Sequence, residues 1–149
     1  MIWVDADAIP RLITELLLKS SRKRKIPVTF VANRPIFLEK APLANAVQVA
    51  GGPDVADDYI AERCGAGELV ITADVPLAAR AVEAGALVLQ PRGRLLDEEN
   101  ISEHLSMRDF HEELRSTGVE GGGPPPFDQR ARVAFANALD RWLSMHWRG

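Results

Sequence analysis

Short apolar runs divide the first ninety residues of the chain into strand-sized pieces. A continuous apolar run, in contrast to an alternating one, is typical of a strand that is buried on both faces of a parallel sheet. These runs end at polar or turn-forming residues and predict strands at residues 2–4, 27–32, 47–50, 68–72 and 86–89.

Amphipathic segments lie between most of these strands. A helix is predicted from residue 8 to about residue 19, and one of its faces carries Leu12, Ile13, Leu16 and Leu17. Further helices are predicted at residues 54–64 and 75–85. Alternating strands and helices form right-handed βαβ units. We therefore predict the α/β class, as a three-layer α/β/α sandwich around a central, mainly parallel, five-stranded sheet.

The last third of the chain predicts C-terminal helices. A capping-box pattern from Asn100 to Glu103 opens a helix that ends at Gly118, and a glycine- and proline-rich connector follows at residues 121–126. A last helix begins near Asp128 and has a stripe of Val133, Phe135, Leu139, Trp142 and Leu143. Such a stripe predicts core packing in preference to a base-stacking platform. We expect one domain over residues 1–149.

The composition excludes some classes of partner and site. Eighteen basic and twenty-one acidic side chains give a net charge of −3, so the molecule as a whole does not attract polyanions, although a local basic surface remains open. Cys64 is the sole cysteine, which excludes an internal disulfide. No signal peptide is apparent, and the apolar runs are too short to span a bilayer. We expect a cytoplasmic protein that does not contact membranes.

Aspartates follow the predicted strands where these end. Asp5 and Asp7 follow the first strand, Asp74 follows the fourth, and Asp57 lies in the helix after the third. Open α/β sheets bind ligands at the carboxyl edge. If the first and fourth strands are neighbours, we expect Asp5 and Asp74 to lie side by side there. Asp57 or Asp58 could join them if the helix after the third strand starts on the same edge. Such carboxylates suit Mg²⁺ or Mn²⁺, and two such ions can activate water for in-line displacement at phosphorus.

These acids also have an explanation as helix caps. Asp7 precedes the first helix, Asp54 with Asp57 resembles a capping box, and Asp74 precedes the third helix. Free N–H groups and the helix dipole stabilise carboxylates at such positions. The spacing alone favours neither caps nor metal ligands. Asp58 points to another side of its helix, so we expect it to face solvent.

Two groups of cations are candidates for contact with phosphate. Residues 19–25 include Arg22, Lys23 and Arg24. These cations either stabilise a helix C-terminus and a solvated connection, which the sequence slightly favours, or they bind substrate phosphates. Arg92, beyond the fifth strand, either meets a substrate phosphate or forms a loop salt bridge.

Other motifs for catalysis are weak or absent in the sequence. The three histidines, at positions 104, 111 and 146, lack paired ligand spacing and are expected at the surface. Cys64 has no obvious histidine or acidic partner and is expected in the core. The sequence contains no GxGxxG, P-loop or GxSxG motif.

Several motifs along the whole chain resemble one family. They are VDADAIP at residues 4–10, DVAD at 54–57, LVITADVPLAA at 69–79, PRG at 91–93, MRDF at 107–110 and GGP at 122–124. On these motifs the chain is identified as a member of the YaiI/YqxD family of uncharacterised bacterial proteins. That family is similar to PIN-like domains, a fold of metal-dependent nucleases with the strand order 3-2-1-4-5. Relatives typically carry cysteine where this chain has Ile9.

The resemblance favours metal ligands over caps and predicts a Mg²⁺- or Mn²⁺-dependent nuclease that acts on RNA in preference to single-stranded DNA. It implies that Asp5 and Asp74 hold the principal ion. It further implies that Asp57 completes the coordination sphere of that ion directly or through water, and that Asp7 binds a second ion or orients a ligating water. Arg92 and the basic residues 22–24 would then position the nucleic acid backbone.

Two rival functions remain from the sequence. One is a non-catalytic RNA-binding or interaction module on the same scaffold. The other is a phosphatase in which Asp5 is the nucleophile and Asp7 the acid. Against the phosphatase, Ile9 stands where haloacid-dehalogenase-like enzymes place a threonine, and no cap domain is available.

Overall fold

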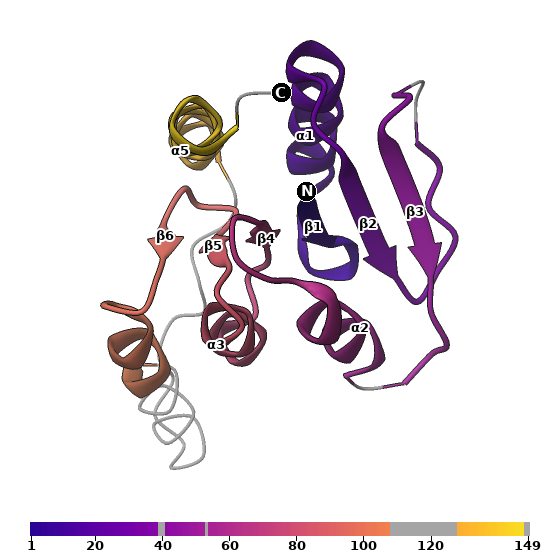
Figure 1. Ribbon diagram of the computed structural model, residues 1–149. Coiled ribbons are helices and arrows are strands. Elements are labelled where there is room, and N and C mark those ends of the chain that lie inside the picture. Colours follow the sequence, from indigo (N-terminus) through magenta and orange to yellow (C-terminus); the bar gives the residue numbers. More distant parts are fainter. Residues whose placement is uncertain (39–40, 53, 108–127, 148–149) are drawn as a thin grey trace.

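The computed structural model describes residues 1–38, 41–52, 54–107 and 128–147 (Figure 1). Residues 101–107 are helical. The other elements are β1 (Ile2–Asp5), the 3-10 helix η1 (Ala6–Ala8), α1 (Arg11–Arg24), β2 (Val28–Ala32), β3 (Ala44–Gln48), α2 (Val55–Arg63), β4 (Leu69–Ile71), α3 (Val75–Glu83), β5 (Leu87–Leu89), β6 (Leu95–Leu96) and α5 (Gln129–His146). The predicted helix end at Gly118, the connector at residues 121–126, His111 and part of the motif at residues 107–110 lie outside the described residues.

The strands form one sheet in the order β3-β2-β1-β4-β5-β6. The strands from β1 to β5 pair in parallel, and β6 is antiparallel to β5. The predicted α/β fold, with a mainly parallel sheet in the order 3-2-1-4-5, is confirmed. The apolar pattern does not predict β6 because this strand has only 2 residues.

Alternating side chains of the buried strands build two separate cores. Ile2 and Val4 of β1 pack with residues of α1 and α5 on one face of the sheet. Trp3 packs with residues of α2 and α3 on the other face, and β4 alternates in the same way. The molecule is therefore a three-layer sandwich (Figure 1). The next residues in the alternation, Asp5 and Thr72, belong to the face that α2 and α3 cover.

Helix α1 separates the two edges of the sheet. It starts after the carboxyl end of β1 and returns the chain to the amino edge, where the carbonyl of Pro27 accepts the N–H of Ile2 at 2.9 Å. At 1.5 Å per residue, its 14 residues span about 21 Å. In Figure 1 the arrowheads of β2 and β3 point toward the end of the molecule where α2 lies, away from the end where α1 finishes.

Two predicted boundaries are wrong by several residues. Strand β3 lies at Ala44–Gln48 instead of residues 47–50, because it is an edge strand with partly exposed side chains and no apolar run marks its start. Helix α1 continues to Arg24, past the predicted end near residue 19, and stops where Lys25 adopts a left-handed conformation with φ of 52°. The basic run therefore forms the last turns of the helix itself.

The predicted apolar stripe of α5 lies in the core, with one exception. Phe135, Leu139, Trp142 and Leu143 are buried and pack against the sheet beside α1. Val133 is 47% exposed, because it lies two residues before Phe135 and so on nearly the opposite side of the helix. No helix within the described residues has the length and apolar character needed to cross a membrane.

Candidate functional site

Asp5 ends β1 and is held by a threonine of the neighbouring strand. The pairing of Val4 with Ile71 places Thr72 beside Asp5. The Thr72 hydroxyl donates to Oδ2 of Asp5 at 2.8 Å and accepts the N–H of Asp74 at 3.0 Å. Both Asp5 and Thr72 are buried, with exposed fractions of 4% and 0%. One hydroxyl group therefore joins the ends of two adjacent strands and orients the carboxylate.

Three other acids act on the Asp5 carboxyl group. Burial raises the pKa of Asp5, the hydrogen bond from Thr72 opposes that rise, and the charges of Asp57, Asp74 and Asp7 add to it, so that the pKa is about 6. Such charge–charge effects are screened beyond about 8 to 10 Å at physiological salt. The structure thus brings these acids, which are distant in sequence, into one electrostatic group. We call Asp5, Asp7, Asp57 and Asp74 the aspartate cluster.

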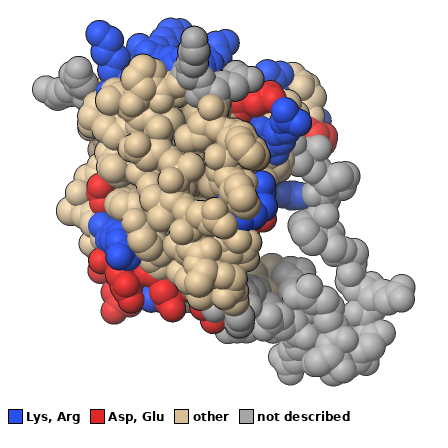
Figure 2. All heavy atoms as spheres, turned by 90° about the vertical axis from the view of Figure 1, so that its right-hand side faces the viewer, with Lys and Arg blue, Asp and Glu red and all other residues tan. Residues whose placement is uncertain are grey.

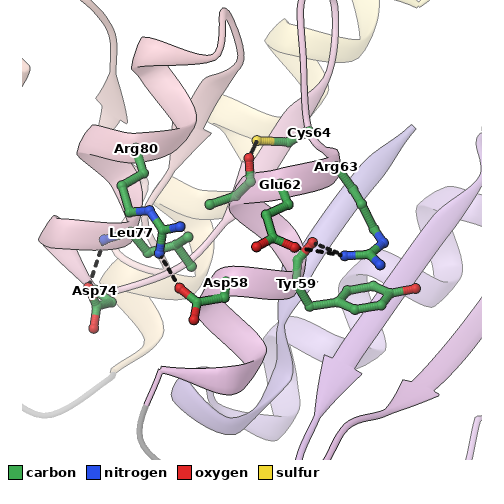
Figure 3. Close-up of polar contacts among 9 residues, drawn as sticks. Asp58, Tyr59, Glu62, Arg63, Cys64, Asp74, Leu77 and Arg80 are labelled. Atoms are coloured by element: carbon green, nitrogen blue, oxygen red, sulfur yellow. Dashed lines mark hydrogen bonds and ion pairs between the residues drawn. The ribbon is translucent and has the colours of Figure 1, made fainter.

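Asp74 is the N-cap of α3, as the cap interpretation predicts. Its Oδ1 accepts the N–H of Leu77 at 2.9 Å (Figure 3). Its Oδ2 accepts no hydrogen bond from the described residues. Capping and ligand binding are therefore compatible at Asp74, because each can use a different oxygen.

The acids of α2 do not form the predicted capping box. Asp54 precedes the helix with φ of 67° and makes no side-chain cap hydrogen bond, because an N-cap residue needs an extended backbone. Burial raises the pKa of Asp57, and the charges of Asp74 and Asp54 raise it further, while Arg80 opposes them. Asp58 is exposed as predicted, and its Oδ1 lies 2.6 Å from Nη1 of Arg80 (Figure 3). Asp57 has no ion-pair partner within the part of the chain that the structure describes.

The prediction that Asp7 caps the first helix is wrong. Asp7 lies in η1 and accepts the N–H of Asn33 at 2.8 Å and Nε–H of Arg34 at 3.2 Å. Nη2 of Arg34 also donates to the carbonyl of Ala6 at 3.5 Å. These contacts arise because β2 is the neighbour of β1, so the loop after β2 meets η1. No sequence motif marks Arg34, although its position directly after a predicted strand places it at the same edge.

The cluster is not arranged as a coordination shell. Among the described residues, no three or more Asp, Glu, His or Cys side chains form a group that could hold a metal ion. Asp74 directs one oxygen to the backbone of α3, and Asp7 directs both of its oxygens to the loop after β2. The helix cap and the loop contacts therefore explain the positions of the Asp74 and Asp7 carboxylates. Repulsion from neighbouring acids still raises the pKa values of Asp5 and Asp57.

The predicted phosphate-contacting cations lie in two separate places. Arg22, Lys23 and Arg24 form the last turn of α1, at the amino edge of the sheet. The length of α1, about 21 Å, separates them from the aspartate cluster, so they do not act on the same phosphate. Arg92 is exposed in the turn between β5 and β6, at the carboxyl end of β5. The predicted salt-bridge alternative is not seen, because no carboxylate among the described residues pairs with Arg92.

The remaining sequence candidates belong to the core or surface. Cys64, the C-cap residue of α2, is buried in the core on the face of the sheet that α2 and α3 cover, as predicted. His146 is exposed and stacks on Trp142, with 5.7 Å between the ring centroids. Neither lies in the aspartate cluster.

Comparison with known proteins gives one consistent family. Residues 3–145 match the family model described as "Uncharacterized BCR, YaiI/YqxD family". A curated "UPF0178 protein" of Saccharophagus degradans is 52% identical over 143 residues, which cover 96% of this chain and 95% of the relative. Another, of Xanthomonas campestris pv. campestris, is 54% identical over 145 residues, covering 96% of this chain and 89% of the relative. No solved structure shows a significant match.

Proposed function

We propose that this chain, which belongs to the YaiI/YqxD family of uncharacterised bacterial proteins, is a divalent-metal-dependent phosphodiesterase that cleaves RNA. The observation that carries the proposal is Asp5, a carboxylate at the carboxyl edge of a parallel sheet whose pKa is raised by burial and further by three other aspartates. Grouped carboxylates are unfavourable unless a cation or a proton compensates them. Perturbed carboxyl groups of this kind concentrate at functional sites.

The donor atoms of the cluster suit a hard cation. Carboxylate oxygens are the ligands that Mg²⁺ and Mn²⁺ prefer in proteins. Oδ1 of Asp5, Oδ2 of Asp74 and both oxygens of Asp57 accept no hydrogen bond from the described residues. Because the described side chains do not by themselves form a coordination shell, these three would have to turn toward one another to hold the ion, with Asp7 beside them. A divalent cation held there would lower the pKa of a water molecule and would balance negative charge at phosphorus.

The surrounding residues position the acids and add charge. Because the Thr72 hydroxyl is bonded to both Asp5 and the backbone of Asp74, it limits the movement of these two residues relative to each other. Arg34, whose side chain is 61% exposed, places a guanidinium group beside Asp7 at the same edge. A guanidinium group can donate two hydrogen bonds to a phosphate, so Arg34 is the cation best placed to orient a substrate phosphodiester.

The sheet topology supports the same function. The resemblance to PIN-like nucleases implies the strand order 3-2-1-4-5, with acids at the ends of the first and fourth strands. The observed sheet contains this order, and Asp5 and Asp74 follow the corresponding strands. A shared fold does not establish chemistry, so the decisive test is cleavage itself.

The test compares cleavage of a labelled single-stranded RNA by variants of the cluster. Asp5→Asn and Asp74→Asn remove a charge and keep the shape, and Asn is as good an N-cap as Asp. We expect each variant to lower Mn²⁺-dependent cleavage by at least about 100-fold, as loss of a metal ligand requires. Asp58→Asn is the matched control, because Asp58 is bonded to Arg80 outside the cluster, and it should cleave at the wild-type rate.

Retained cleavage in both cluster variants would remove the nuclease proposal. The competing class is a non-catalytic RNA-binding module, and calorimetry with Mn²⁺ in the presence and absence of an RNA oligomer separates the two. An enzyme binds Mn²⁺ through Asp5 and Asp74 and turns over. A binding module retains RNA affinity without turnover and with weak affinity for Mn²⁺.

A further inference from the structure

Basic side chains gather at the end of the molecule away from the aspartate cluster. Figure 2 shows Lys and Arg side chains at the top, the end where α1 finishes, and a group of Asp and Glu side chains at the lower left. The last turn of α1 contributes Arg22, Lys23 and Arg24 to the basic end. The net charge of −3 therefore conceals two regions of opposite sign.

A groove with basic walls lies between α1 and α5. It has a volume of about 420 Å³ and is lined by three leucines of α1, by Glu15, Lys19 and Arg22 of the same helix, and by Arg132 of α5. Glu15 is paired with Arg11, at 3.7 Å between Oε1 and Nε, so a cation outside the groove balances its charge. Three cationic side chains and one carboxylate from two helices therefore line the groove.

Arg132 occupies a position that disfavours a cation. It lies in the first turn of α5, where the positive end of the helix dipole repels positive charge, and the carboxylate of the N-cap Asp128 is directed to the N–H of Ala131. Its Nε is also the one buried side-chain polar atom among the described residues that lacks a hydrogen-bond partner. A buried donor without an acceptor costs stability. An anion in the groove would compensate the charge and offer the guanidinium group an acceptor.

We propose that the groove between α1 and α5 binds phosphate groups of an RNA backbone. The choice of RNA rests on the proposed function, whereas the choice of phosphate rests on Lys19, Arg22 and Arg132. The part of α1 that lines the groove, from Leu12 to Arg22, is about 15 Å long, which exceeds the spacing of successive phosphates. The groove thus provides an anchoring surface for a strand, at a distance from the aspartate cluster.

The experiment measures binding of a labelled single-stranded RNA by fluorescence anisotropy in EDTA, so that no cleavage enters the signal. The double variant Lys19→Ala with Arg132→Ala should bind at least about tenfold more weakly and should lower the slope of log K against log salt by about 1.4, since each lost contact to a single strand changes it by about 0.7. Circular dichroism checks that the variant is folded. Unchanged affinity and slope would overturn the proposal.

Two controls make the result specific. Arg141→Ala removes an exposed cation from the same helix outside the groove and should leave the salt slope unchanged. If Arg132→Ala and Arg141→Ala weakened RNA binding equally, the attraction would be general and the proposed site would be overturned. Anchoring is measured in EDTA and cleavage with Mn²⁺, so loss of anchoring in the groove variant and loss of cleavage in Asp5→Asn are distinguishable. Calorimetric binding of inorganic phosphate without RNA binding would also overturn the proposal, because it indicates a small-anion site.

Discussion

Replacing Asp5 by asparagine should stabilise the protein at neutral pH. In the folded chain the pKa of Asp5 is about 6, above its ordinary value of 3.8, because burial and the neighbouring acids disfavour the charged form. The folded state therefore holds the Asp5 proton more tightly than the unfolded state does. For an acid with a raised pKa, stability is lost as the pH rises from about 4 to about 6 and is not regained above that range.

The magnitude follows from the two pKa values. The difference between 3.8 and about 6 corresponds to about 3 kcal/mol at pH 7, as an upper value. Asparagine never ionises and keeps an oxygen that can accept the hydrogen bond from Thr72. Asp5→Asn should therefore gain up to about 3 kcal/mol at pH 7, or roughly 6 to 12 °C in Tm, and almost nothing below pH 4.

The assay is urea unfolding at a series of pH values between 4 and 8, followed by the fluorescence of Trp3, Trp142 and Trp147. Asp58→Asn is the control, since it removes only an exposed ion pair with Arg80 and should change the free energy of unfolding by less than about 1 kcal/mol. The reasoning is refuted if Asp5→Asn is less stable than the wild type at pH 7, or if it loses stability between pH 4 and 6 as the wild type does.

Three further predictions concern the same cluster. Mn²⁺ at a concentration 100 times its Kd should stabilise the wild type by about 2.7 kcal/mol, as measured by thermal unfolding. The stabilisation should be much smaller in Asp5→Asn, and an equal stabilisation of both proteins would place the ion elsewhere. Thr72→Val should lower the free energy of unfolding in urea by about 1 to 3 kcal/mol, because it leaves the Asp5 carboxylate and the Asp74 N–H without their shared partner. An unchanged free energy of unfolding would show that water replaces the hydroxyl. Asp74→Ala should cost about 1 kcal/mol of stability through loss of the α3 cap, whereas Asp74→Asn should cost little, and equal losses would contradict the capping role.

The layered fold is predictable from the sequence because burial dictates composition. Strands covered by helices on both faces need continuous apolar runs, and β1, β2, β4 and β5 have them. Strand β3 does not begin with an apolar run, since it lies at the edge of the sheet and exposes part of its side chains. Strand β6 cannot be predicted from the apolar pattern, because 2 residues are too few to show a periodicity. The predictions therefore fail where burial is incomplete or the element is too short.

The site was predictable residue by residue but not in its contacts. The position of Asp5, Asp7 and Asp74 after strands follows from the chain alone, and so does the N-cap at Asp74. The pairing of Asp7 with Arg34 does not, because it depends on β2 lying beside β1. The absence of a cap at Asp54 depends on a backbone φ of 67° that no propensity indicates.

The sequence by itself determined the family, the sandwich of helices on a parallel sheet, and the presence of acids at the carboxyl edge. Only the tertiary structure decided which charges are neighbours. It grouped Asp5 with Asp57 and Asp74, and it placed the basic turn of α1 at the far edge of the sheet. The physical reason is that local sequence sets the conformation of each segment, whereas strand order and helix direction set the distances between charges on different segments.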